Sequence, residues 1–220
     1  MLKPIPFWIV ILSLSALWAS TGCYKNLVEK TPEPGKTWSC DEEADKAMAL
    51  QDWQTGMLLH ERFLEKSPTN ALAMYHLGYA YGQIGDHRRE VFYYEKAIAS
   101  GFITERIYFN LGMACGELAE TEKSISAFKK ALELNPENPD NHFGLAMAYD
   151  QEGVNAGLAE EEFLKALEID PTHSEARLYL GMLYADEGEI PKACQQLREI
   201  LRIDPADERA RRILEHIEKE

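Results

Sequence analysis

A short sequence pattern recurs every 34 or 35 residues, and this spacing constrains the fold more than any other feature. Each copy contains a leucine followed by a small residue, and successive leucines are 34, 34 and 35 residues apart: Leu77, Leu111, Leu145 and Leu180. A second apolar position recurs at intervals of 34, 35 and 34 residues, and it is occupied by Ala97, Ala131, Ala166 and Ile200. A sustained period of this length indicates a repeat array, in which one supersecondary unit is copied along the chain.

Each copy has the pattern of two packed helices. Apolar residues recur at spacings of three and four, which places them on one face of a helix. The small residues that follow the leucines let two helices approach closely: Gly78, Gly112, Ala146 and Gly181. Glu90 stands where the second helix of one copy should carry a small residue. We therefore predict looser packing around Glu90.

The repeat resembles the tetratricopeptide repeat (TPR), a pair of helices joined by a short turn. The leucine-glycine pairs and the Asn-Pro or Asp-Pro endings carry the resemblance, and these endings lie at Pro136, Pro171 and Pro205. It implies an all-α fold, a right-handed TPR superhelical solenoid of five helix pairs plus a C-terminal capping helix. Such a helix covers the last hydrophobic face of an array. We place the TPR domain at residues 37–220, with repeats at 37–70, 71–104, 105–138, 139–173 and 174–207 and the capping helix at 208–220.

Residues 1–22 have the composition of an export signal. The segment from Ile5 to Ala19 is apolar apart from two serines and spans 15 residues, which is short for a membrane-spanning helix of about 20 residues. The small residues before Cys23 resemble a bacterial lipobox, although Ser20 stands where leucine is commoner. The resemblance implies that residues 1–22 are a cleaved lipoprotein signal peptide and that Cys23 carries acyl chains such as palmitate. An uncleaved membrane anchor and a plain signal peptide are the alternatives.

The residue that follows the lipidated cysteine determines the target membrane in lipoproteins of this kind. Aspartate in this place retains a lipoprotein in the inner membrane, whereas this chain has Tyr24. The resemblance therefore implies lipid anchoring in the bacterial outer membrane, with the TPR domain facing the periplasm. Two or more acyl chains give stable anchoring. Residues 23–36, which contain two prolines and a glycine after the lipidated cysteine, are predicted to form a flexible tether.

Charge and side-chain distribution argue against other classes of function. The net charge of −14, without a basic stripe, disfavours a nucleic-acid partner. The six histidines are scattered along the sequence, with no cysteine or glutamate at metal-ligand spacing. We therefore expect no enzyme activity, no metal site and no cofactor. Three further cysteines fall on interior positions of the repeat and are predicted to be buried free thiols: Cys40, Cys115 and Cys194.

An apolar stripe on the first helices is the candidate functional site. In TPR proteins, positions 5 and 9 of each repeat face a bound partner, and exposed apolar stripes mark binding surfaces. The residues at these positions are Tyr75, Tyr79, Phe109, Met113, Phe143, Met147, Leu178 and Met182. Acidic residues lie nearby in the sequence: Glu117, Asp150, Glu175 and Asp186. They favour a partner with basic flanks. The alternative is that neighbouring first helices, or the tether, bury the stripe.

These features together predict a membrane-anchored adaptor or scaffold that binds a partner protein in an apolar concave groove. A lipidated array of five repeats resembles the pilotin lipoproteins of type IV pilus systems, which help a secretin to assemble in the outer membrane. That resemblance rests on architecture alone, and it implies a secretin as the partner. An adaptor lipoprotein for outer-membrane barrel assembly or for envelope enzymes is the alternative.

Overall fold

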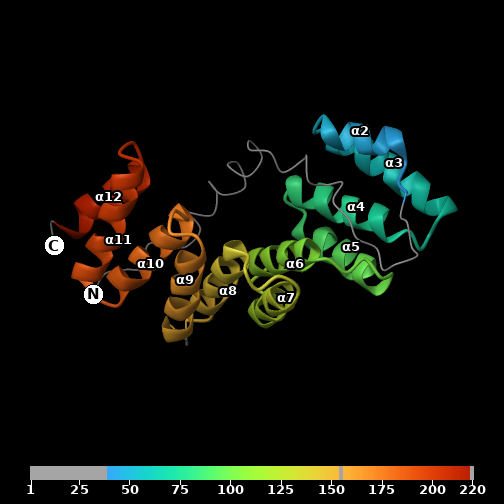
Figure 1. Cartoon of the computed structure of the whole chain (residues 1–220). Coiled ribbons are helices and arrows are strands. Elements are labelled where there is room, and N and C mark those ends of the chain that lie inside the picture. Colours follow the sequence, from blue (N-terminus) through green and yellow to red (C-terminus); the bar gives the residue numbers. More distant parts are fainter. Residues whose placement is uncertain (1–38, 154–155, 219–220) are drawn as a thin grey trace. The chain divides into compact units, whose positions relative to one another are not determined.

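The protein is all-helical in the part of the chain that the structure describes. The computed structural model describes residues 39–153 and 156–218, and the predicted signal peptide, Cys23 and the tether up to residue 36 lie outside these ranges. Every regular element within them is an α-helix (Figure 1). The predicted all-α class is confirmed. Among the described helices, none combines the length and the apolar character that crossing a membrane requires.

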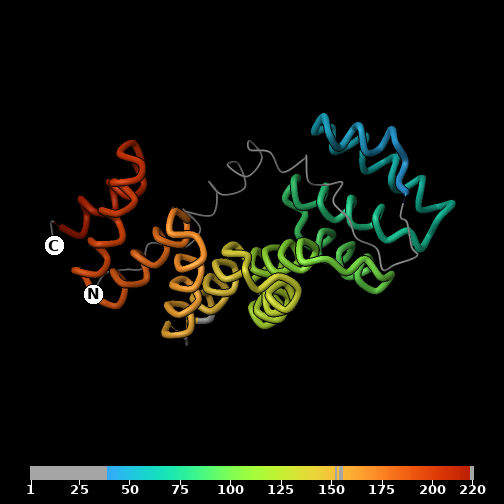
Figure 2. The backbone as a smooth tube through the Cα atoms, viewed as in Figure 1, coloured from blue at the N-terminus to red at the C-terminus, as the bar shows by residue number. Residues whose placement is uncertain are grey.

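The helices follow one another as five pairs and a final single helix. The pairs are α2 (Glu42–Ala49) with α3 (Trp53–Lys66), α4 (Ala71–Gln83) with α5 (His87–Ala99), α6 (Glu105–Glu117) with α7 (Thr121–Leu134), α8 (Pro139–Glu152) with α9 (Ala156–Ile169), and α10 (Ser174–Asp186) with α11 (Ile190–Ile203). The last helix is α12 (Glu208–Ile217). The backbone trace shows the chain reversing direction at the turn within each pair (Figure 2).

The chain divides into two compact units. The first extends to Ile107 and the second begins at Tyr108, so the division falls inside α6. In the first unit, α3 packs against both α2 and α4, and α4 packs against α5. In the second unit, α8 packs against α7 and α9, α10 packs against α9 and α11, and α11 packs against α12. Each unit is therefore a stack in which a helix contacts the helices next to it in sequence.

The turn within each pair contains one residue with a left-handed backbone. Glycine occupies this place in three turns, at Gly85, Gly153 and Gly188, with φ between 69° and 78°. In the other two turns the residue is Gln51, with φ of 60°, or Ala119, with φ of 56°. A side chain on a left-handed residue is strained by about 1 kcal/mol or more, because Cβ crowds the carbonyl oxygen that follows it. The repeat geometry thus imposes this conformation even where glycine is missing.

Close helix contacts in the first unit depend on glycine. A Cβ atom on Gly78 of α4 would lie 2.6 Å from the ring of Tyr94 on α5, so only glycine allows this approach. We predicted loose packing around Glu90, but its side chain is buried. Its carboxylate fills the space over Gly82 on α4, where an added Cβ would lie 2.5 Å from a Glu90 oxygen. The expectation of loose packing at Glu90 was therefore wrong, because Gly82 compensates for the larger side chain.

The second unit has an aromatic and aliphatic core. Phe128 of α7 lies directly over Gly144 of α8, where an added Cβ would be 2.2 Å from the ring. At the C-terminal end, Ala210 of α12 is buried with Leu178, Leu197 and Ile200, and other apolar residues of α12 pack around this cluster. The final helix thus covers the apolar side of the last pair, as a capping helix does.

Candidate functional site

The residues at position 5 of the predicted stripe are mostly buried. Tyr75, Phe143 and Leu178 expose 3%, 4% and 1% of their surface, whereas Phe109 is half-buried. Each of the three buried side chains contacts a residue outside its own helix. The ring of Tyr75 stacks on Phe102 at a centroid distance of 5.0 Å. Phe143 meets Tyr179 of α10 at 5.5 Å, and Leu178 packs with Ala210 of α12.

The neighbours that bury these side chains differ from one repeat to the next. Phe143 meets Tyr179 of the next first helix, and Leu178 packs with α12, which follows the last pair. Tyr75 is covered by Tyr94 of its own pair and by Phe102. The alternative considered from the sequence, burial by neighbouring first helices, therefore holds for Phe143. These residues contribute to the core and offer little surface to a partner. Phe109 makes an edge-on contact with Phe128, with centroids 5.7 Å apart.

The residues at position 9 are partly exposed. They are Tyr79, Met113, Met147 and Met182, all of which are half-buried. Tyr79 lies edge-on to Trp53 of α3, with ring centroids 5.9 Å apart, and Met182 packs beside the cluster around Leu178. A half-buried methionine has an unbranched, flexible side chain with a polarisable thioether, which suits contact with partners of varied shape. The role of these four residues in binding stays a prediction.

Acidic side chains accompany the methionines in the second unit. Burial raises the pKa of Asp150 on α8, and the negative charges of Asp186 and Glu187 raise it further. Burial also raises the pKa of Asp186, at the end of α10. A carboxyl group whose pKa is raised by other acids lies in a region of negative potential. The ends of α8 and α10 therefore form an acidic patch, which we define as Asp150, Asp186 and Glu187.

Tyr179 on α10 lies close enough to several acidic side chains for their charges to affect its pKa. Its hydroxyl oxygen is buried and forms no hydrogen bond among the described residues. Burial raises the pKa of Tyr179 to about 12, with Arg209 opposing this effect and Glu175, Glu117 and Asp150 adding to it. Glu175 is itself paired with Arg209, at 3.5 Å between guanidinium nitrogen and carboxylate oxygen. Of the four acids singled out from the sequence, Glu175 is thus partly neutralised.

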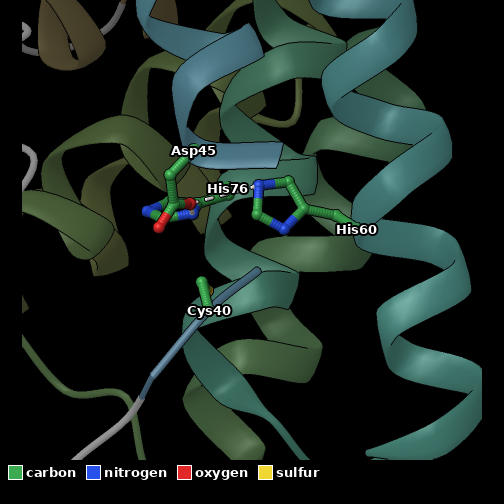
Figure 3. Close-up of side chains that lie close together, drawn as sticks. All are labelled: Cys40, Asp45, His60 and His76. Carbon is green, nitrogen blue, oxygen red and sulfur yellow. Dashed lines mark ion pairs between the residues drawn. The ribbon is translucent and has the colours of Figure 1, made fainter. Parts of the chain in front are cut away.

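The cysteines and histidines are placed differently from the sequence expectation. All three cysteines in the described part are free thiols; Cys115 and Cys194 are buried, but Cys40 is half-buried. His60 and His76 are not scattered, because their rings lie 5.0 Å apart. Cys40 and Asp45 lie against the same two rings (Figure 3). Sequence spacing missed this group because its members come from four separate segments.

The repeat pattern and the helix pairs together match a known family. Profiles described as tetratricopeptide repeat match residues 71–100, 105–138 and 155–217, which is more than half of the chain. The chain belongs to the tetratricopeptide repeat family. TPR domains bind protein partners and are typically scaffolds without catalytic activity. The predicted TPR solenoid fold is therefore confirmed. A sequence search of curated proteins returned no match.

Solved TPR structures share the fold. YrrB, a TPR protein described as having an unusual peptide-binding site, is 23% identical over 77% of this chain and 87% of its own, with a TM-score of 0.68. MamA is 23% identical over 74% of this chain and 95% of its own, with a TM-score of 0.69. MamA from Desulfovibrio magneticus is 13% identical over 77% and 99%, with a TM-score of 0.68. Identities this low support the shared fold alone.

Proposed function

We propose that this TPR protein is an adaptor that binds a basic segment of a partner protein along α8 and α10. The observation that carries the proposal is the acidic patch of Asp150, Asp186 and Glu187, where the pKa of Asp150 is raised by burial and by its acidic neighbours. A site that holds acids together against their mutual repulsion is stabilised when a cationic partner binds. Met147 and Met182 belong to the same two helices and are half-buried.

Apolar contacts supply affinity in this proposal, and charge supplies selectivity. A methionine that a partner covers completely contributes about 1.5–3 kcal/mol before ordering costs. Met147 and Met182 are already half-buried, so each contributes only part of that amount. The acidic patch raises the association rate of a positively charged segment and disfavours an acidic one. The preferred ligand is therefore a segment with apolar side chains flanked by lysine or arginine.

We further propose that the adaptor is a lipoprotein with a pilotin-like role. In this proposal Cys23 is acylated, the TPR domain faces the periplasm from the outer membrane, and the partner is a secretin of a type IV pilus system. The support is the lipobox-like sequence before Cys23 and the similarity of a lipidated repeat array to pilotins. An adaptor for barrel assembly or for envelope enzymes would use the same surface with a different partner.

The binding surface is tested by paired charge-introducing variants. The test variant carries Met147→Glu and Met182→Glu, and the matched control carries Leu158→Glu and Leu164→Glu on α9, where both leucines are exposed. The lipidated protein is used to capture partners from detergent-solubilised membranes. We expect the control to retain its partner and the test variant to lose it while circular dichroism shows an unchanged helical content. Undiminished capture by the folded test variant would contradict the proposed surface.

The pilotin-like role is tested in the same experiment by identifying the captured protein. Recovery of a secretin supports the role, and mass spectrometry of Cys23 for attached acyl chains tests the anchor. Recovery of a barrel-assembly protein or an envelope enzyme would keep the adaptor function and overturn the pilotin-like role. A Cys23→Ser variant that stays in the membrane fraction to the same extent would contradict lipid anchoring.

A further inference from the structure

Four side chains with metal-binding atoms converge in the first unit. They are Cys40 in the segment before α2, Asp45 on α2, His60 on α3 and His76 on α4 (Figure 3). One ligand atom from each residue lies within 4.8 Å of the ligand atom of every other. A carboxylate oxygen of Asp45 is 2.9 Å from Nδ1 of His76 and 3.5 Å from Nε2 of His60. No other such group occurs among the described residues.

The repeat period shows that His60 occupies a core position. Residues 60, 94, 128, 163 and 197 are related by steps of 34 or 35, and the other four are Tyr94, Phe128, Phe163 and Leu197. All five side chains are fully buried. The equivalent contact in the second unit is a stack of two carbon rings, Phe163 on Tyr179. The first repeat thus has an imidazole at the position where the other four repeats have tyrosine, phenylalanine or leucine.

The hydrogen bonding of His60 does not explain this choice. Its exposure is 0%, Nδ1 forms no hydrogen bond among the described residues, and Nε2 has only the long contact of 3.5 Å with Asp45. A neutral imidazole keeps a lone pair on one of its two nitrogens. A buried imidazole with so little hydrogen bonding is costly, so its presence here calls for a ligand that accepts that lone pair.

We propose that Cys40, Asp45, His60 and His76 bind one divalent transition-metal ion of the zinc class. One sulfur, two imidazole nitrogens and one carboxylate oxygen match the ligands that Zn²⁺ prefers, whereas Mg²⁺ and Ca²⁺ prefer oxygen atoms alone. Ligand atoms of a tetrahedral zinc site lie about 3.4 Å apart. Distances of 2.9 and 3.5 Å, and an upper limit of 4.8 Å, require only small side-chain movements.

Charge balance fits a divalent ion. Binding transfers the thiol proton of Cys40 to solvent, and the resulting thiolate and the Asp45 carboxylate together supply two negative charges. The metal ion itself stabilises the thiolate, as coordinated cations do. Asp45 is 40% exposed and provides the side from which an ion enters.

The position of the site indicates a structural role. Four protein ligands leave no open coordination position, which is typical of structural zinc sites. The ion would join the segment before α2 to α2, α3 and α4. The backbone oxygen of Ser39 accepts a hydrogen bond of 2.9 Å from the Asn70 side chain, which already holds this segment beside the start of α4.

Spectroscopic titration with Co²⁺ tests the site directly. The full chain is purified in detergent, reduced and treated with a chelator, and Co²⁺ is then added. We expect saturation at one equivalent, the visible bands of tetrahedral Co²⁺ and a near-ultraviolet band from thiolate-to-cobalt charge transfer, all abolished when Zn²⁺ is added. A spectrum typical of octahedral Co²⁺ without a thiolate band would overturn the proposal, because it would leave Cys40 uncoordinated.

Variants assign the ligands. Cys40→Ser removes the charge-transfer band, and His76→Gln weakens Zn²⁺ binding by more than about 100-fold, beyond the 10–100-fold cost of losing a residue that only orients a ligand. Cys194→Ser, which removes a cysteine of the second unit, leaves both measurements unchanged. Cys40→Ser with an unchanged charge-transfer band and affinity would overturn the assignment.

A measurement on the unaltered chain covers the case in which a variant fails to fold. Alkylation of each cysteine is followed by mass spectrometry with and without Zn²⁺. The reaction is run at alkaline pH, because the thiolate is the form that is alkylated. Cys40 is half-buried, and the buried Cys115 and Cys194 serve as references. We expect Zn²⁺ to slow alkylation of Cys40 by at least tenfold and to leave the ratio of the other two unchanged. Equal rates at Cys40 with and without Zn²⁺ would overturn the proposal.

Discussion

Phe163 on α9 and His60 on α3 occupy the same position of the repeat, yet they build different contacts. Phe163 is fully buried and stacks on Tyr179, with ring centroids 6.4 Å apart. His60 is equally buried but faces His76 across 5.0 Å, with Asp45 and Cys40 beside both rings. An aromatic contact is stabilised by burial alone, whereas an imidazole contact needs hydrogen bonds or a metal ion. The same position of the repeat therefore makes a contact of different chemistry in each unit.

Removing the aromatic contact should have the largest effect. Phe163→Ala leaves a cavity between α9 and α10, and large-to-small changes of this kind cost about 3–5 kcal/mol. We expect a loss of that size in the free energy of unfolding, measured by chemical denaturation. Phe92→Ala serves as the control because its side chain is 48% exposed, and its cost should be below about 1 kcal/mol. Equal losses for the two variants would show that Phe163 does not hold the second unit together.

Replacing the His60 imidazole with a phenyl ring should raise the free energy of unfolding without metal, and this advantage over the unaltered chain should be lost with metal. In chelator, His60→Phe removes two buried nitrogens without hydrogen bonds, so the variant should gain about 1–3 kcal/mol in free energy of unfolding. With Zn²⁺ at 100 times its dissociation constant, the unaltered chain gains about 2.7 kcal/mol and the variant gains nothing. Thermal unfolding with and without Zn²⁺ measures both differences. A variant that Zn²⁺ stabilises as strongly as the unaltered chain would contradict the difference between the two contacts.

Acid should weaken partner binding at the second unit before it weakens the fold. Because the pKa of Asp150 is raised, this carboxyl is protonated at a higher pH than an ordinary aspartate, and a cationic segment loses its attraction. The folded state binds that proton more tightly than the unfolded state, so protonation of Asp150 stabilises the fold. We expect about a three- to tenfold loss of affinity for a lysine-flanked leucine peptide as the pH falls from 7 until Asp150 is protonated.

The control for the pH experiment is Asp150→Asn. This variant lacks the titrating group, so its affinity should be lower at pH 7 and should change less with pH. Fluorescence anisotropy of the labelled peptide measures both proteins across the pH range. An identical pH dependence in the two proteins would assign the effect to other groups and remove Asp150 from the binding surface.

The smallest expected effect concerns the turns that all repeats share. Ala119 has φ of 56° where three other turns have glycine. Ala119→Gly should therefore gain about 0.5–1 kcal/mol in free energy of unfolding by relieving the left-handed strain. Gly85→Ala is the converse change, and no atom lies within 4 Å of the added Cβ. Its loss of about 1 kcal/mol, measured by the same denaturation, would come from the backbone alone, and a gain would contradict the account of the turns.

The sequence period was sufficient to predict the fold class. Spacing of the leucines from Leu77 to Leu180 indicated paired helices because local helix packing is written into apolar periodicity. The stripe was harder to predict, because the burial of Phe143 depends on Tyr179 of the following repeat and not on its own helix pair. Glu90 was misjudged for a different reason, because the compensating residue is Gly82 on the other helix of the same pair.

The unusual residue at position 60 could have been noticed by aligning the repeats with one another. His60 aligns with Tyr94, Phe128 and Phe163, so a polar ring at a core position was visible in the sequence. What the sequence could not provide was the meeting of this ring with His76, Asp45 and Cys40, because the four residues come from separate segments without metal-motif spacing. Contacts between side chains of different helices, both within a repeat and between repeats, are therefore what the sequence alone could not provide.

The most direct test of the difference between the two units is a crystal structure of the zinc-loaded protein with anomalous data collected at the zinc absorption edge. The account predicts one strong anomalous peak in the first unit, at about 2.0–2.3 Å from the ligand atoms of Cys40, Asp45, His60 and His76. It predicts no peak at the aromatic contact of Phe163 and Tyr179. Density that shows the four side chains without an anomalous peak between them would contradict it.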